Sequence, residues 1–184
     1  MNSVALPVKP RLVRYCQLII SIVTAQNTEN FALRLLPILA KLGLALPAAY
    51  LVHRTIRPLA GGSSRYRVLI LEKGIFTEDI LEVLGAAVDI QVFGVNRAIV
   101  KSMARGILPR AICDDANYVS DDPAAERAKI RYLKLCRGVW RYLSFFRRYD
   151  AVISGNWCYW AERELATTLE EAGTPFIVLH KEGL

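Results

Sequence analysis

The chain has 184 residues, of which 53% are hydrophobic and 22% are charged, so it is long enough and apolar enough for one domain with a buried core. Its 11 Gly and 8 Pro occur without a biased tract or a repeat, which excludes collagen-like, linker-like and solenoid proteins. The formal net charge of +7 arises in residues 1–67, where nine Lys or Arg face one acid, Glu29, whereas the rest of the chain is nearly neutral.

The first 64 residues predict a helical segment that associates with a membrane. Apolar stretches at 15–28 and 42–52 are shorter than the roughly 18 uncharged residues of a spanning helix. Leucines at helical spacing, with Arg34 and Lys41 on another face, are typical of an amphipathic segment on an anionic bilayer. A pair of helices packed on the body, or a secretory signal, would also account for the pattern. We expect peripheral binding at the cytoplasmic face.

Residues 65–184 predict an α/β domain, because short apolar runs alternate with helical patterns after the joint at 61–64. Strands are expected at 67–72, 88–93, 149–154 and 175–179, and helices after N-caps at Thr77 and Asn96 and over 124–148 and 157–171. The strands lack polar alternation, so both faces of the sheet should be covered and neighbouring strands parallel. The sequence therefore predicts a doubly wound, Rossmann-like, mostly parallel sheet.

Polar residues follow three of the expected strands, at the edge where such sheets bind ligands. The candidate substrate-binding residues are Lys73, Gly74, Gly155 and Asn156, beside Glu72 and Ser154, and the candidate catalytic residues are His180 and Glu182, beside Lys181. Histidine can act as a general base near pH 7, and a neighbouring carboxylate can orient it or bind hydroxyl groups. The same residues are also typical of solvated turns and helix caps, and for Glu72 and Lys73 the pattern favours a solvated turn.

The helix expected over 124–148 separates its bases from its apolar residues. The bases are Arg127, Arg131, Lys134, Arg137, Arg141 and Arg148, and the opposite face carries Tyr132, Leu135, Cys136, Val139, Leu143 and Phe146. A membrane-facing helix and a solvated helix both account for this pattern. Nucleic acid is not an expected partner, because most aromatic residues point inward or lie at the helix end and no nucleic-acid motif is present.

Several common chemistries have no motif in the sequence. The cysteines Cys16, Cys113, Cys136 and Cys158 form no C-x-x-C pair, so neither a disulfide framework nor a zinc site is expected, and a reducing compartment fits best. The dinucleotide-binding, P-loop, nucleophile-elbow and H-E-x-x-H motifs are also missing. No metal and no cofactor are therefore predicted.

Three segments carry a resemblance to a known family. They read Val-Leu-Ile-Leu-Glu-Lys-Gly at 68–74, Tyr-Asp-Ala-Val-Ile-Ser-Gly-Asn at 149–156 and Gly-Thr-Pro-Phe-Ile-Val-Leu-His-Lys-Glu-Gly-Leu at 173–184. With these motifs, residues 67–184 resemble the N-terminal half of GT-B glycosyltransferases of bacterial surface-polysaccharide assembly. The resemblance implies an acceptor-binding domain that often touches the membrane and faces a second domain holding a nucleotide-sugar, with metal-independent transfer in most such enzymes.

The sequence also departs from this family. A donor-binding half is not part of the 184 residues, and the Gly-Gly-His-Thr signature of the split, membrane-anchored N-acetylglucosaminyl transferases is missing. We therefore expect either a fragment of a longer enzyme or a half that docks with a donor-binding subunit, inactive alone. Its partners would be an acceptor glycan or lipid-linked sugar and anionic lipid. The alternative is a non-catalytic α/β interaction module at the membrane surface.

Overall fold

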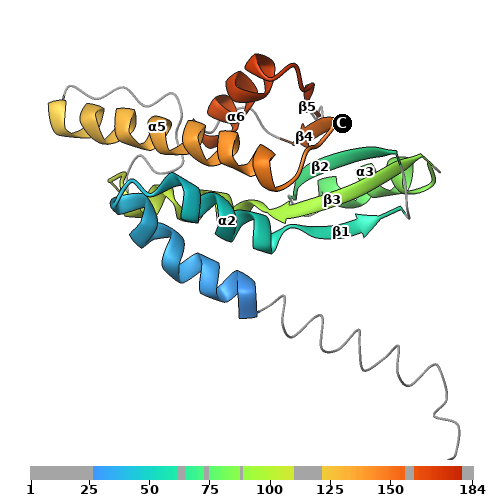
Figure 1. Ribbon diagram of the computed structural model, residues 1–184, viewed down its shortest axis with the longest axis horizontal. Helices are drawn as coiled ribbons and strands as arrows, with labels where there is room; N and C mark the ends of the chain where they lie inside the picture. The colour runs from blue at the N-terminus through green and yellow to red at the C-terminus, as the bar shows by residue number, and fades with distance from the viewer. Residues whose placement is uncertain are drawn as a thin grey trace, which may run out of the picture.

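The computed structural model describes residues 27–61, 65–72, 75–87, 89–109, 122–155 and 160–179. A helix over residues 27–41 comes first. The following elements, shown in Figure 1, are α2 (Ala45–Thr55), β1 (Arg57–Ala60), β2 (Tyr66–Glu72), α3 (Ile75–Gly85), β3 (Ile90–Asn96), α4 (Arg97–Ser102), the 3-10 turn η1 (Ala104–Gly106), α5 (Pro123–Phe146), β4 (Ala151–Ser154), α6 (Trp160–Glu171) and β5 (Phe176–Val178).

One five-stranded sheet in the order β1-β3-β2-β4-β5 organises the fold. The four strands from β2 to β5 pair in parallel, whereas β1 pairs antiparallel with β3. The structure confirms the α/β class and the mostly parallel sheet, which is compatible with a Rossmann-like fold. Strand β1 was not expected from the sequence, because Arg57–Ala60 contains Pro58 and no apolar run. Proline is tolerated there because β1 is an edge strand.

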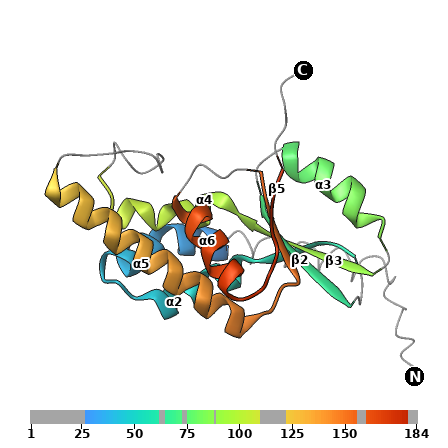
Figure 2. The same cartoon turned by 90° about the horizontal axis from the view of Figure 1, so that it is seen from above.

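The helices cover the two faces of the sheet unequally (Figure 2). Helix α3 lies on one face, where Ile80 packs against Val68 and Ile70 of β2. The helix over residues 27–41 and helices α2, α4, α5 and α6 share the core on the opposite face, to which β2 contributes Leu69 and Leu71. The alternation along β2 follows from the two-residue period of a strand and explains why its apolar run is continuous.

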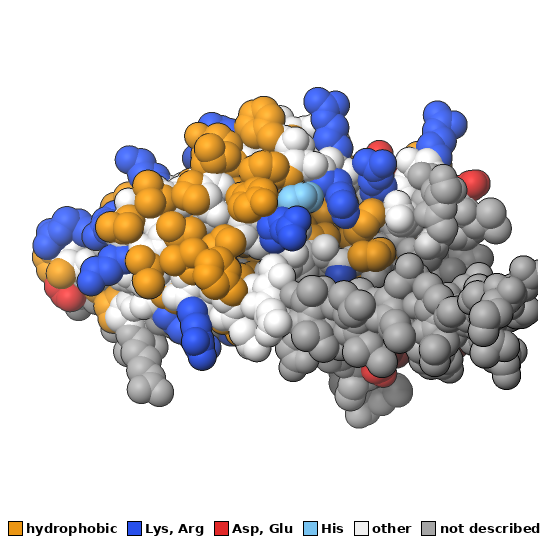
Figure 3. All heavy atoms as spheres, turned by 60° about the horizontal axis from the view of Figure 1, so that its bottom comes forward, with side chains coloured by type: hydrophobic (Ala, Val, Ile, Leu, Met, Phe, Trp, Pro, Cys, Tyr) orange, Lys and Arg blue, Asp and Glu red, His pale blue; other side chains and the backbone are white. Residues whose placement is uncertain are grey.

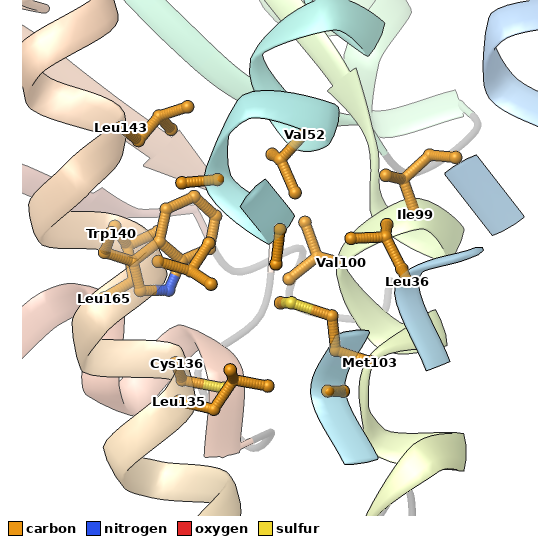
Figure 4. Close-up of a cluster of buried hydrophobic side chains, with 14 of the residues drawn as sticks. Leu36, Val52, Ile99, Val100, Met103, Leu135, Cys136, Trp140, Leu143 and Leu165 are labelled. Carbon is orange, nitrogen blue, oxygen red and sulfur yellow. The ribbon is translucent and has the colours of Figure 1, made fainter. Parts of the chain in front are cut away.

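The larger core joins the N-terminal helices to the body (Figure 4). Leu36 and Val52 lie in the same buried cluster as Ile99, Trp140 and Leu165, which come from α4, α5 and α6. A Cβ built on Gly138 of α5 would lie 2.8 Å from the Cβ of Ala45, so this glycine allows α2 to pack closely on α5. The boundary expected at residue 64 stays a prediction, but the helices before it are packed on the domain.

Local signals predicted the elements better than their ends. Asn96 caps α4 as expected, because its side-chain oxygen accepts a hydrogen bond from the Ala98 N–H at 2.9 Å. Thr77 was expected to cap α3, but the helix begins two residues earlier and Thr77 is buried in its first turn. Phe146 was expected on the buried face of α5, yet it remains 37% exposed because it lies in the last turn of the helix.

Candidate functional site

The carboxyl ends of β2, β4 and β5 are neighbours in the sheet. Leu71 pairs with Ser154, which in turn pairs with Val178, and the Leu179 N–H donates to the Ser154 carbonyl at 2.9 Å. Chain order reverses here, since the chain moves from β2 outward to β3 and then returns across β2 to β4. Such a reversal is where open α/β sheets bind ligands. The three predicted clusters therefore follow adjacent strand ends.

Only part of the predicted site falls within the described residues. Gly155 follows β4 directly and is partly exposed. The other predicted site residues, Lys73, Gly74, Asn156, His180 and Glu182, lie outside the described residues. The substrate-binding and catalytic roles given to them stay predictions.

Glu72, at the end of β2, is held by an ion pair. Its carboxylate extends over Gly94 of β3, whose missing side chain leaves the space, and meets the Arg57 guanidinium at 2.9 Å. The Glu72 Oε1 atom is buried and accepts no hydrogen bond from the described residues. This side chain therefore braces the strand ends of β1, β2 and β3 on the α3 face.

A buried ion pair spans the end of β2 on the opposite face. The Arg97 Nε atom, at the start of α4, lies 2.7 Å from Glu162 Oε1 in the first turn of α6, and both side chains are almost fully buried. Burial raises the pKa of the Glu162 carboxyl, and the Arg97 charge offsets part of this effect. Sequence reasoning missed this pair, and the one available signal was that Arg97 directly follows an apolar strand.

Two pockets lie at the amino edge of the parallel strands, away from the predicted site. The larger has a volume of about 730 Å³, and its lining includes Arg67, Gln91, Phe93, Arg147 and Arg148. The second, of about 560 Å³, lies between α5 and α6 and shares Arg147 and Arg148 with the first. Sequence reasoning missed both pockets, because their arginines belong to the start of β2 and the end of α5.

Aromatic rings contact Arg147 and His53 beside the larger pocket. The Arg147 guanidinium lies over the Phe93 ring, 4.4 Å from its centre, which is the geometry of a cation–π interaction. His53 stacks on Phe146 with ring centres 5.3 Å apart. Burial lowers the pKa of His53, and the charges of Arg147 and Arg54 lower it further. The end of α5 is therefore electropositive.

Exposed apolar side chains gather on α2, on the turn before it and on α5, beside the larger pocket. We call this set the apolar face; its members are Leu42, Leu44, Leu46, Tyr50, Tyr142, Phe145 and Phe146. Ring contacts connect Tyr50 with Phe146 and Tyr142 with Phe145. Figure 3 shows hydrophobic side chains gathered over these helices, with Lys and Arg side chains around them.

The two stretches of sequence that contain the residues of the apolar face hold no Asp or Glu. Asp and Glu are missing from residues 30–71 and from residues 127–149, which together contain 14 Lys or Arg. Some of these bases are neutralised, since Arg137 and Arg141 pair with Glu164 and Glu171 of α6. Lys41, which precedes Leu42, and Arg54 in the last turn of α2 form no ion pair with any described residue.

Other site chemistries lack support among the described residues. These residues contain no cluster of His, Cys, Asp and Glu that would hold a metal ion. Burial raises the pKa of the Cys136 thiol to about 12, so this cysteine has no nucleophilic thiolate near neutral pH. None of the described helices combines the length and the apolar character needed to cross a membrane.

The comparisons with known proteins place the chain in no family. No protein-family model matches it, and no curated protein and no solved structure is significantly similar to it. Function must therefore be inferred from the site geometry alone.

Proposed function

We propose that this protein is a peripheral α/β module that binds an anionic membrane surface through its apolar face. One observation carries this proposal: seven large apolar side chains are exposed on α2, on the turn before it and on α5, within stretches of chain that hold bases and no acids. An exposed apolar patch with basic surroundings is typical of interfacial binding.

Both the exposed apolar side chains and the nearby bases favour binding to a bilayer. The Phe145 side chain is 76% exposed, so its insertion at the acyl boundary would remove most of its surface from water. Tyr50 and Tyr142 have the amphipathic rings that concentrate at membrane interfaces. Lys41 and Arg54 would each add about 1 kcal/mol of attraction to an anionic surface. A protein partner would need acids to match these bases, whereas an anionic leaflet supplies negative charge everywhere.

Flotation of the full chain with lipid vesicles tests this proposal. We expect the protein to float with vesicles of phosphatidylcholine and phosphatidylserine and to remain largely free with phosphatidylcholine alone. Raising the salt from about 0.1 M to about 1 M should weaken the binding, because the Debye length falls from about 10 Å to about 3 Å. A chain that ignores both vesicles but self-associates would refute the proposal and assign the apolar face to a protein contact.

A second function, the acceptor side of a glycosyltransferase, is favoured by the carboxyl edge of the sheet. The register makes the carboxyl ends of β2, β4 and β5 neighbours where the chain order reverses, which supports this proposal. In this proposal the finer, doubly wound Rossmann-like description applies, Lys73, Gly74, Gly155 and Asn156 line the acceptor cleft, and His180 and Glu182 are base and hydroxyl ligand.

Turnover in the presence of a donor-binding half tests this second function. We expect His180→Ala and Glu182→Ala each to lower kcat by about 10²-fold, the typical contribution of general acid–base catalysis. Substitution of the exposed Arg163 on α6 by Gln is the matched control, because it lies outside the cluster. Unchanged turnover in both variants would refute the catalytic roles of His180 and Glu182 and leave them as turn or cap residues.

A further inference from the structure

The larger pocket at the amino edge combines three guanidinium groups from two separate segments. Arg67 comes from the start of β2, and Arg147 and Arg148 follow the last residue of α5. None of the ion pairs of the described residues involves these three arginines. The lining contains no acid, and its remaining polar side chains are those of Gln91 and Ser144.

The helix end explains only part of this charge. Cations at a helix C-terminus gain about 0.3–1 kcal/mol from the macrodipole, and Arg147 and Arg148 occupy such a position after α5. Arg67 has no such reason to be there, because it belongs to a strand. Its backbone N–H donates to Asp150 Oδ2 at 2.7 Å, so this carboxylate binds the β2 backbone.

The adjoining pocket supplies a further buried polar group. The Tyr149 hydroxyl interacts with the Arg147 guanidinium, which can only donate a hydrogen bond, so the hydroxyl proton has no acceptor among the described residues. Tyr149 lines the second pocket together with Arg147 and Arg148. A buried donor of this kind is costly unless something accepts its proton, and an anion next to the arginines would do so.

We infer that the larger pocket binds a phosphate monoester, carried either by the headgroup of an anionic lipid or by a soluble molecule. Arginine forms paired, charge-assisted hydrogen bonds with phosphate oxygens, and a monoester carries a charge of about −1.5 to −2 at pH 7. The volume of about 730 Å³ also accommodates the group that bears the phosphate. The lipid source rests on the proposed membrane binding, because Phe145 and Phe146 belong both to the apolar face and to the pocket wall.

Vesicles of matched surface charge test the lipid source. Vesicles with phosphatidic acid present a monoester, whereas vesicles with phosphatidylserine present a diester and a carboxylate. We expect the full chain to bind phosphatidic acid vesicles about tenfold more tightly at equal surface potential. The double variant Arg67→Gln/Arg148→Gln should lose this preference, whereas Lys41→Gln/Arg54→Gln, with the same charge change outside the pocket, should weaken binding to both vesicles equally.

A soluble probe tests the pocket without a membrane. Glycerol 3-phosphate should shift the NMR signals of the Arg67 and Arg148 side chains and raise the pKa of His53, because a bound anion offsets the charge of Arg147. Arg67→Gln/Arg148→Gln should weaken this binding at least tenfold, and Arg163→Gln on α6 should leave it unchanged.

The two arms separate failure of the pocket from failure of membrane binding. Binding of glycerol 3-phosphate by a protein that ignores all vesicles would support the pocket, assign a soluble ligand and refute the membrane proposal. Equal binding to both anionic vesicles, with no response to glycerol 3-phosphate, would support the membrane proposal and overturn the pocket.

Discussion

At the carboxyl edge of the sheet Arg97 is buried against Glu162, whereas at the amino edge Arg67, Arg147 and Arg148 line a pocket that contains no acid. Arginine therefore has a different role at each edge: it is buried in an ion pair at the carboxyl edge and lines an open pocket at the amino edge. A buried arginine must be paired, and its partner fixes α4 relative to α6. Unpaired arginines around a pocket remain available to an anion from outside. The difference indicates that the ion pair holds α4 and α6 together at the carboxyl edge. The arginines at the amino edge form no ion pair with the described residues.

Removal of Arg97 is the largest expected effect. Arg97→Met leaves the Glu162 carboxylate buried without its partner, so we expect a loss of about 3–5 kcal/mol in the free energy of unfolding. Urea denaturation measures this loss. Arg148→Gln is the matched change at the amino edge and should alter stability by less than about 0.5 kcal/mol, since the side chain is exposed. Equal losses in the two variants would erase the distinction between the edges.

A double substitution sharpens the same comparison. Replacement of both partners by apolar residues, as Arg97→Met/Glu162→Leu, removes the buried charges together. We expect it to recover most of the stability that Arg97→Met loses, because a buried ion pair is often no better than an apolar pair of similar volume. A double variant as unstable as the single one would mean that the other contacts of Arg97, and not the charge of Glu162, dominate.

The space above Gly94 provides the next largest effect. A methyl group added by Gly94→Ala would meet the Glu72 carboxylate and the Leu59 side chain, so we expect a loss of about 1–3 kcal/mol. Glu72→Ala alone should cost less, because its partner Arg57 is 53% exposed. In the double variant the two losses should not add, since removal of the carboxylate makes room for the methyl group. Additive losses, measured by urea denaturation, would contradict this placement of Glu72.

The smallest effect is the pH dependence that His53 adds at the electropositive end of α5. Burial and two arginines lower the pKa of His53 below its ordinary value of 6.5, so the unfolded chain takes up the proton more readily. The contribution of His53 to the free energy of unfolding is fully present above pH 6.5. It is lost as the pH falls toward the pKa of the folded state. The difference in Tm between the wild type and His53→Gln should therefore narrow as the pH falls below 6.5. A constant difference from about pH 5 to pH 8 would refute this.

Strand and helix signals that depend on neighbouring residues were predictable from the sequence. The apolar runs located β2, β4 and β5, and the cap at Asn96 located the start of α4. The antiparallel strand β1 was not predictable from the sequence, because its position depends on the pairing of Arg57 with Gly94, which is far along the chain. The adjacency of the three strand ends followed from the general topology of parallel sheets.

The features that depend on tertiary packing escaped prediction. Arg97 and Glu162 are distant in sequence. Arg97 follows β3 and Glu162 lies in the helix after β4, and these two strands flank β2 in the sheet, which brings the two side chains together. From the sequence, Arg148 was assigned to the basic face of a helix and Arg67 to the basic first third of the chain, and Arg147 was not singled out. No local signal places the start of β2 beside the end of α5. The amphipathic pattern of the N-terminal segment was recognised. Residues of 27–55 pack on the body, as its alternative predicts, and membrane association remains a proposal.

The most direct test of the membrane proposal compares two exposed apolar sites on opposite faces of the sheet. Leu46→Asp/Phe145→Asp places two acids on the apolar face, and Val83→Asp on α3 is the control, because Val83 is 75% exposed and Phe145 76%. We predict that the first variant loses about tenfold or more in binding to phosphatidylserine vesicles while the second binds like the wild type. Equal binding by all three proteins, each folded by circular dichroism, would contradict the proposal.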